Sequence, residues 1–214
     1  KPTISFHVDA VQALAKIPTE KYLTERVDFA TFSSHKFHGV RGVGFVYIKS
    51  GKKITPLLTG GGQERDYRST TENVAGIAAT AKALRLSMEK LDIFSSKTGQ
   101  MKAVIRQALL DYPDIFVFSD EEDFAPHILT FGIKGVRGEV IVHAFEDYDI
   151  FISTTSACSS KAGKPAGTLI AMGVDKDKAQ SAVRLSLDLE NDMSQVEQFL
   201  TKLKLIYNQT RKVR

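Results

Sequence analysis

Several kinds of residue and segment are scarce in this sequence. It has one cysteine and no tryptophan among 214 residues, so no disulfide can form within the chain. No apolar run approaches the roughly 20 residues that a membrane-spanning helix needs, and no segment has the pattern of a signal peptide. These features exclude a disulfide-based fold and favour a cytoplasmic protein with no membrane partner.

The composition is that of an ordinary folded protein. Hydrophobic residues make up 43% and charged residues 25%, which a disordered chain would not combine in this way. The net charge of +4 is dispersed, and its densest stretch, residues 210–214, is interpreted as a solvated terminus. Neither a basic nucleic-acid-binding arm nor a metal-ligand pattern is therefore expected.

The chain starts in an unusual way for a complete protein. It has no initiator methionine, and Lys1-Pro2-Thr3 leads directly into a strand-like segment. We therefore expect the chain to be a piece of a larger protein.

Hydrophobic periodicity predicts an α/β arrangement followed by an α+β one. Buried strands are expected at residues 4–8, 27–32 and 43–48. An amphipathic helix is expected where apolar residues recur at spacings of three and four, at Val74, Ile77, Ala81, Leu84, Met88 and Leu91. Further on, helices are expected at 97–110 and 139–146, and strands at 115–118, 127–131, 150–153 and 183–187.

The last helix is expected to start at a capping box formed by Asp192 and Gln195. The pattern predicts two domains, a partial α/β domain over residues 1–92 and an α+β domain over 93–214. The fold class is therefore expected to be α/β.

A carboxylate and an amide follow the first predicted strand. Asp9 ends this strand and Gln12 comes one turn later. A carboxylate in this place can hold a protonated heterocyclic nitrogen, as pyridoxal phosphate enzymes require. The alternative is an aspartate that caps a helix.

A lysine follows the second predicted strand, in Ser33-Ser34-His35-Lys36. A lysine at such a position can form a Schiff base, and a neighbouring hydroxyl and imidazole can bind phosphate. The alternative is an ordinary exposed lysine.

Two later segments also carry candidate chemistry. Glycines 60–62 with the polar run 68–73 could cradle an anion or could form a flexible loop. Cys158 lies in Ser156-Ala157-Cys158-Ser159-Ser160, a polar context that favours a reactive cysteine over a buried one.

These segments together resemble the NifS-like cysteine desulfurases, which are class-V members of the fold-type-I pyridoxal phosphate enzymes. The resemblance covers essentially the whole chain. It is carried, in order, by His-Val-Asp-Ala-Val-Gln, Ser-Ser-His-Lys-Phe-His-Gly, the triple glycine with Arg-Ser-Thr-Thr-Glu-Asn, Ala-Pro-His-Ile-Leu, Gly-Glu-Val-Ile-Val-His-Ala, Ser-Ala-Cys-Ser-Ser and Arg-Leu-Ser.

The resemblance implies a pyridoxal 5′-phosphate site. Lys36 would hold the cofactor as a Schiff base and move protons on the substrate. Asp9 would pair with the ring nitrogen and Gln12 with the ring hydroxyl. Ser33 and His35 would hold the phosphate.

The resemblance also implies a substrate, a sulfur carrier and a homodimer. Thr71 would reach the phosphate bound by the partner subunit. Arg184 would bind the carboxylate of L-cysteine, a task that suits a forked guanidinium. Cys158 would take the sulfur as a persulfide and pass it to a sulfur-acceptor protein.

The resemblance further implies that residues 1–92 are the C-terminal portion of the cofactor-binding large domain, with the cysteine loop in the small domain. The missing N-terminal half would complete the site. The sulfur could serve iron–sulfur cluster assembly or tRNA thiolation, so nucleic acid would be an indirect partner. The sequence departs from the family pattern at Thr70 and Asp188, where a glycine is usual.

Two alternatives remain open at this point. One is another class-V enzyme, either an aminotransferase or a selenocysteine lyase, which would keep Asp9 and Lys36 but would not need Cys158. The other is an inactive fragment, whose partial sheet would expose edges prone to pairing.

Overall fold

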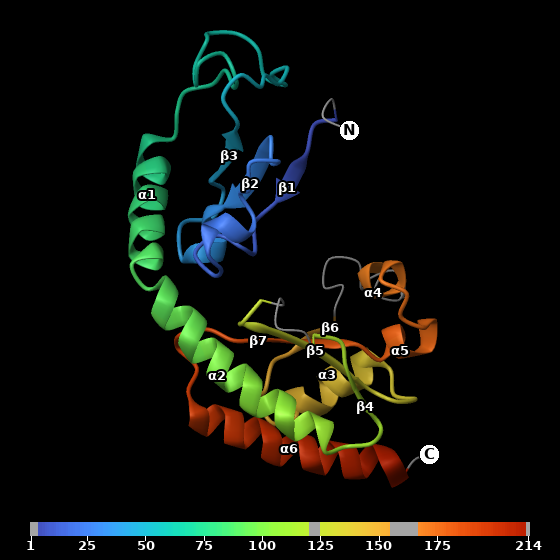
Figure 1. Cartoon of the computed structure of the whole chain (residues 1–214). Helices are drawn as coiled ribbons and strands as arrows, with labels where there is room; N and C mark the ends of the chain where they lie inside the picture. The colour runs from blue at the N-terminus through green and yellow to red at the C-terminus, as the bar shows by residue number, and fades with distance from the viewer. Residues whose placement is uncertain (1–3, 120–124, 155–166, 213–214) are drawn as a thin grey trace. The chain divides into compact units, whose positions relative to one another are not determined.

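The chain forms two compact units, Lys1–Asp92 and Ile93–Arg214 (Figure 1). The computed structural model describes residues 4–119, 125–154 and 167–212. Cys158 lies outside these described residues. The fold is mixed α/β, as the sequence predicted.

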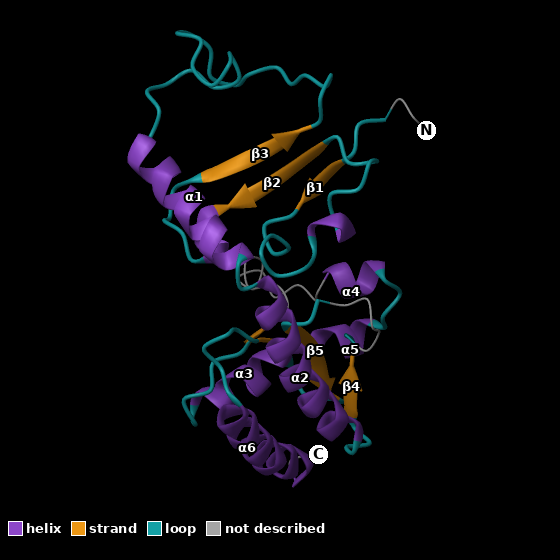
Figure 2. Ribbon diagram, turned by 60° about the vertical axis from the view of Figure 1, so that its left-hand side comes forward, coloured by secondary structure: helices purple, strands orange, loops and turns teal. Residues whose placement is uncertain are grey.

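The first unit is built on a three-stranded mixed sheet of order β1-β2-β3 (Figure 2). β1 (His7–Asp9) runs parallel to β2 (Phe29–Ser33), and β2 runs antiparallel to β3 (Gly44–Ile48). The crossover from β1 to β2 contains turns and the short 3₁₀-helix η1 (Thr19–Lys21). The three predicted strands are thus present, with shifted ends.

One face of this sheet is the core of the first unit. Ala30 and Phe32 alternate along β2 and are buried, as the period of two requires. The ring of Phe32 stacks on Phe45 of β3, with centroids 4.8 Å apart. The prediction that residues 4–8 form a buried strand was wrong, because β1 is an edge strand of the described sheet and its ends, His7 and Asp9, are exposed.

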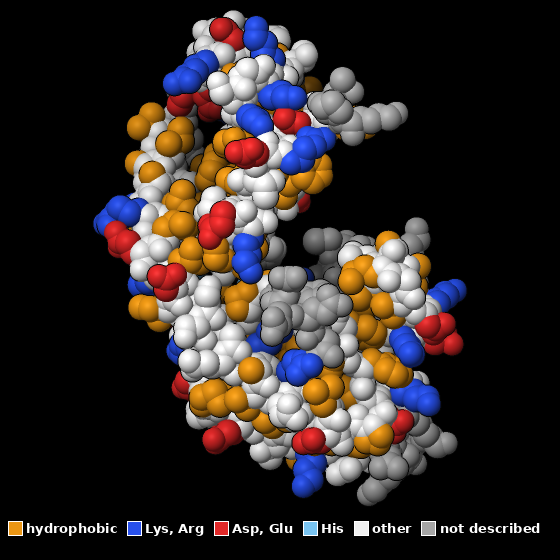
Figure 3. All heavy atoms as spheres, viewed as in Figure 1, with side chains coloured by type: hydrophobic (Ala, Val, Ile, Leu, Met, Phe, Trp, Pro, Cys, Tyr) orange, Lys and Arg blue, Asp and Glu red, His pale blue; other side chains and the backbone are white. Residues whose placement is uncertain are grey.

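Helix α1 (Val74–Met88) confirms the predicted helix, and Asn73 caps it by accepting a hydrogen bond from Gly76 N at 3.0 Å. Its predicted apolar face is largely open, with Val74 72% and Ile77 46% exposed. Hydrophobic side chains gather along α1 at the molecular surface (Figure 3). The buried residues of α1 are instead the small Gly76 and the polar Thr80.

The second unit pairs an antiparallel sheet of order β4-β5-β7-β6 with helices. Its elements, in chain order, are α2 (Leu91–Leu110), β4 (Ile115–Val117), β5 (Ile128–Ile133), α3 (Gly138–Glu146), β6 (Ser153–Thr154), α4 (Gly167–Ala171), α5 (Lys176–Gln180), β7 (Val183–Ser186) and α6 (Met193–Lys212). The short helices α4 and α5 were not predicted.

The core of the second unit lies between one face of its sheet and helices α2, α3 and α6. Phe131 and Val183 face this core from β5 and β7, and the rings of Phe145 and Phe199 stack 4.9 Å apart. At the start of α6 the predicted capping box is confirmed. Asp192 Oδ1 accepts from Gln195 N at 3.0 Å, and Gln195 Oε1 accepts from Asp192 N at 3.2 Å.

Candidate functional site

Two candidate residues, Asp9 and Ser33, lie at the same end of the sheet, where β1 and β2 have their carboxyl ends. Because the strands are parallel and Asp9 pairs with Thr31, Asp9 shares a sheet face with Thr31 and Ser33. The strand spacing and rise put the Cα atoms of Asp9 and Ser33 about 8 Å apart. Ligands of open α/β sheets bind beyond such carboxyl ends.

The 3₁₀-helix η2 (Ser34–Phe37) presents the candidate lysine. Side chains at positions i and i+3 of a 3₁₀-helix lie on the same side, and here Ser34 and Phe37 are buried. His35 is therefore exposed and Lys36 half-buried, on the outer side of the turn. The hydroxyl of Ser33, the residue before this helix, makes no capping hydrogen bond to it.

Asp9 is the last residue of β1, and Gln12 lies in the turn that follows. Oδ1 of Asp9 accepts a hydrogen bond from Val11 N at 3.1 Å, and both Asp9 and Gln12 are exposed. The carboxylate thus has a fixed local orientation with its outer side open. His7 lies on the same face of β1, and its Nε2 is 3.2 Å from Thr31 Oγ1, a contact that the sequence did not predict.

Helix α1 contacts η2 through two side-chain hydroxyls. Thr80 Oγ1 lies 2.9 Å from Ser34 Oγ, and Ser87 Oγ donates to the carbonyl oxygen of Phe37 at 3.0 Å. Sequence reasoning missed both residues. A signal was present, since Thr80 and Ser87 are about two turns apart and so share a helix face.

Thr71 lies in the loop between β3 and α1 and is exposed. In this loop Gly60 and Gly62 have positive φ, and Ser69 N donates to Leu58 O at 3.0 Å. Arg68 Nη1 donates to the hydroxyl of Thr70, the residue that replaces the family's usual glycine. Within the described residues, no hydrogen bond joins Thr71 to η2.

Arg184, the candidate for the substrate carboxylate, lies on β7 in the second unit. It is paired in register with Ser153 of β6, and its Nη2 donates to Ser153 Oγ at 3.2 Å. Its neighbours Val183 and Leu185 face the core, so its half-buried side chain lies on the opposite face. Its Nε is buried and has no hydrogen-bond partner in the part of the chain that the structure describes.

The other departure from the family pattern, Asp188, forms part of a turn after β7. Its Oδ1 accepts from Leu189 N at 2.6 Å, and its own N–H donates to Asn191 Oδ1 at 2.8 Å. A carboxylate is therefore accommodated here by local hydrogen bonds.

The amino ends of β1 and β2 hold an ion cluster away from the candidate residues. Asp28 Oδ2 accepts from Phe6 N at 2.9 Å, while Lys52 and Arg26 lie 3.1 and 3.2 Å from its carboxylate oxygens. The Phe6 N–H, assisted by the two cations, holds the pKa of Asp28 below its ordinary value. This cluster ties the chain before β1 to β2 and is interpreted as structural.

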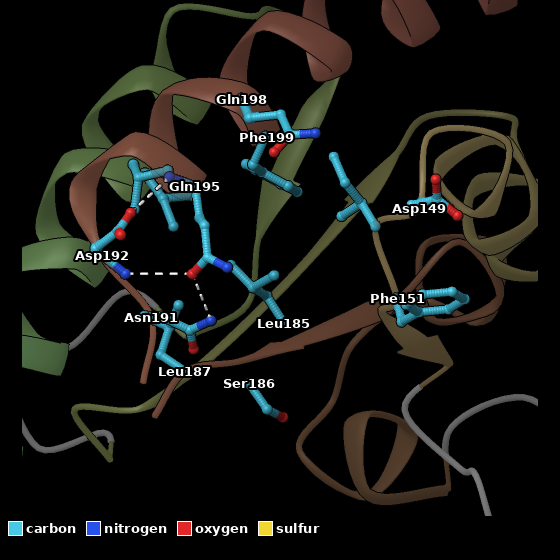
Figure 4. A pocket seen from close by; sticks show the side chains of 13 residues that line it. Asp149, Phe151, Leu185, Ser186, Leu187, Asn191, Asp192, Gln195, Gln198 and Phe199 are labelled. Atoms are coloured by element: carbon cyan, nitrogen blue, oxygen red, sulfur yellow. Dashed lines mark hydrogen bonds between the residues drawn. The ribbon is translucent and has the colours of Figure 1, made fainter. Parts of the chain in front are cut away.

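A pocket of about 180 Å³ lies in the second unit, but none of the predicted site residues lines it (Figure 4). Gln195 points into it and is held by Asn191 and Asp192. These polar groups cap the start of α6. Across residues 4–119, 125–154 and 167–212, no cluster of potential metal ligands occurs and no helix is long and apolar enough to cross a bilayer.

Comparisons with a family model and with known sequences agree on one family. The aminotransferase class-V family matches residues 1–199. The chain is 48% identical, over 99% of its length, to a NifS/IcsS protein homolog of Lactobacillus delbrueckii subsp. bulgaricus. It is 35% identical, over 98% of its length, to cysteine desulfurase IscS of Clostridium botulinum. It spans only about half of these relatives, 55% and 53% respectively.

Solved structures give the same result. A NifS-like protein superimposes on 95% of the chain with a TM-score of 0.82 and 36% identity, and the match covers 52% of that protein. A NifS-like protein from Rickettsia africae also has a TM-score of 0.82, with 30% identity. That match covers 95% of this chain and 54% of that protein.

Proposed function

This chain belongs to the aminotransferase class-V family, and we propose that the whole protein is a cysteine desulfurase dependent on pyridoxal 5′-phosphate. It would convert L-cysteine to L-alanine and leave the sulfur on Cys158 as a persulfide. The observation that carries the proposal is the position of Asp9 and Lys36. Asp9 is the last residue of β1, and Lys36 lies on η2, directly after the carboxyl end of the adjacent parallel strand β2. The relatives named cysteine desulfurase support the same reaction.

The described residues fit pyridoxal phosphate. The exposed Asp9 carboxylate can pair with a protonated ring nitrogen, and Gln12 beside it can bind the ring hydroxyl. Ser33 and His35 can hold the phosphate, and Lys36 can bind the aldehyde carbon and then move a proton on the substrate. When bound, the cofactor supplies an electron sink for the substrate carbons.

Arg184 and Cys158 complete the proposed chemistry on the side of the substrate. The Nε of Arg184, buried and without a partner among the residues that the structure describes, is a donor that a carboxylate would satisfy. Ser153, the hydrogen-bond partner of Arg184, comes a few residues before Cys158 in the sequence. Its thiolate would attack the substrate sulfur, because the deprotonated form is the nucleophile. A cytoplasmic location suits a cysteine that must stay reduced.

We propose that the N-terminal half of the protein and a second subunit complete the site. The open apolar residues of α1, among them Val74 and Ile77, support this, because contiguous exposed apolar surface marks an interface. Thr71 would then serve the phosphate of the partner subunit. The final acceptor would be a protein that takes sulfur for cluster assembly or tRNA thiolation.

The proposal is tested by peptide mass spectrometry on the complete gene product after exposure to L-cysteine. One additional sulfur on the Cys158 peptide is expected, and it should be absent from a Lys36→Ala variant. A protein that is loaded with pyridoxal phosphate but never acquires this sulfur would contradict desulfurase activity and favour another class-V reaction.

A further inference from the structure

Two hydrogen bonds join α1 to η2, one on each side of Lys36 in the sequence. Thr80 contacts Ser34, which lies on the N-terminal side of the lysine, and Ser87 donates to Phe37 O on the other side. Ser34 is fully buried, and Thr80 is only 6% exposed. The turn that carries the lysine is thus attached to the helix at both ends.

The Ser34–Thr80 contact is part of a longer chain of hydrogen bonds. Thr80 Oγ1 also lies 2.8 Å from Gly76 O, and a hydroxyl has only one proton to donate. The Thr80 proton therefore goes to the Gly76 carbonyl, and Ser34 donates to Thr80 Oγ1. Both buried hydroxyls are satisfied in this arrangement. Loss of the Thr80 hydroxyl would leave the buried Ser34 hydroxyl without this partner, whereas Thr80 would keep its bond to Gly76 O if the Ser34 hydroxyl were lost.

The backbone of Ser34 is also held by hydrogen bonds and by a close approach to Gly39. Ser34 N donates to Val43 O and Ser34 O accepts from Gly39 N, both at 3.0 Å. A Cβ atom at Gly39 would lie 2.0 Å from Ser34 Oγ, so the close approach requires glycine there. Ser34 consequently has little freedom to move independently of Thr80.

We propose that Thr80 and Ser87 are positioning residues that hold Lys36 in place for the cofactor, acting through Ser34 and Phe37. The inference rests on the proposed function, because it assigns the cofactor to Lys36. Reactive groups must be held close to their productive geometry, and buried hydrogen bonds behind the reactive residue serve this purpose. Helix α1 would therefore contribute to the site without touching the substrate.

The first measurement uses three substitutions in the complete gene product. Thr80→Val keeps the shape but removes the hydroxyl, and Thr80→Ser restores the hydroxyl. Thr98→Val is the matched control, because Thr98 is also buried in a helix and donates to the carbonyl four residues earlier, Phe94 O, at 2.7 Å. Thr98 has no role in η2.

The first measurement is amide hydrogen exchange over residues 34–39, with and without pyridoxal phosphate. Exchange in Thr80→Val should be about tenfold faster there, the size expected when one buried hydrogen bond is lost. Thr80→Ser should exchange at close to the parental rate, and Thr98→Val should be unchanged in this segment. Parental exchange in Thr80→Val, or equal acceleration in Thr98→Val, would overturn the proposal.

The second measurement is the fraction of Lys36 that carries cofactor, found by borohydride reduction and peptide mass spectrometry across a pyridoxal phosphate titration. The half-saturating concentration should rise about tenfold in Thr80→Val and less in Ser87→Ala. An unchanged titration in both variants would overturn the positioning role. If the parent protein itself never carries cofactor on Lys36, the proposed function fails, while the exchange result still decides whether α1 holds η2.

If Thr80→Val does not fold, Ser34→Ala replaces it, because that change removes the other hydroxyl of the same contact. Faster exchange over residues 35–39 is expected. Parental exchange together with a parental cofactor titration would overturn the proposal.

Discussion

Arg184 Nη2 donates a hydrogen bond to Ser153 Oγ at 3.2 Å across neighbouring strands β7 and β6. The bond orients a guanidinium whose Nε is buried without a partner among the described residues. It links the residue proposed to bind the substrate carboxylate to the strand that precedes the cysteine segment.

Ser153→Ala should raise KM for L-cysteine while leaving kcat close to the parental value. The hydroxyl orients Arg184 but does not touch the reacting atoms, so its loss should cost the worth of one hydrogen bond, ~0.5–1.5 kcal/mol or about two- to tenfold in KM. Steady-state kinetics of the complete protein would measure this. Ser186→Ala, an exposed serine further along β7, is the control. An unchanged KM in Ser153→Ala would contradict the orienting role.

Lys36→Ala should abolish alanine formation and the visible absorbance of lysine-bound cofactor. No other described residue of η2 carries an amine, so the covalent attachment would be lost. Absorbance spectra and alanine assays of the complete protein would test this. Lys82→Ala, which changes an exposed lysine on α1, should behave like the parent protein. Alanine formation at the parental rate in Lys36→Ala would exclude Lys36 as the cofactor lysine.

Cys158→Ala should bind pyridoxal phosphate normally but should release no sulfide from L-cysteine. The variant lacks the only thiol in this chain that could accept the substrate sulfur. Cofactor absorbance and sulfide assays separate the two effects. Sulfide release at the parental rate would show that Cys158 is not the nucleophile.

Acid should weaken the first unit through Asp28. Its folded-state pKa is lowered, so its stabilising contribution is fully present above the unfolded-state pKa of about 4 and is lost as the pH falls through the lower folded-state value. Asp28→Asn should therefore lower Tm at pH 7, and the deficit should shrink as the medium is acidified. Thermal melts from pH 7 to pH 3 would measure this.

Asp66→Asn is the control for that experiment, since Asp66 is an exposed aspartate of the same unit. Its Tm should follow the parental curve at every pH. A deficit in Asp28→Asn that stayed constant with pH would contradict the assignment.

Local patterns determined most of the secondary structure. The capping box at Asp192 and Gln195 was predictable because both partners lie within one helical turn. The strands of both sheets were also predictable from short-range periodicity. Their ends were not, as in β6, where the predicted strand 150–153 overlaps the observed Ser153–Thr154 only at Ser153. Among the described residues of this segment, these two alone pair with β7.

Motif order determined the chemical interpretation, since Asp9, Lys36 and Arg184 each lie in a segment that resembles the same family. The sequence also predicted that α1 is a helix with an apolar stripe. It did not predict that this stripe would stay open, or that the face with Thr80 would pack on η2. Which face a helix buries depends on the surface opposite it, and that surface is formed by residues distant in sequence.

The sequence by itself therefore determined which residues could do chemistry and which segments are helices and strands, because these depend on side-chain type and near neighbours. Only the tertiary structure decided that Asp9 and the turn that carries Lys36 lie at the same end of the sheet, since this follows from the parallel pairing of β1 with β2. It also decided that Ser34 is buried against Thr80, because that contact requires the loop after β3 to return α1 to the end of β2.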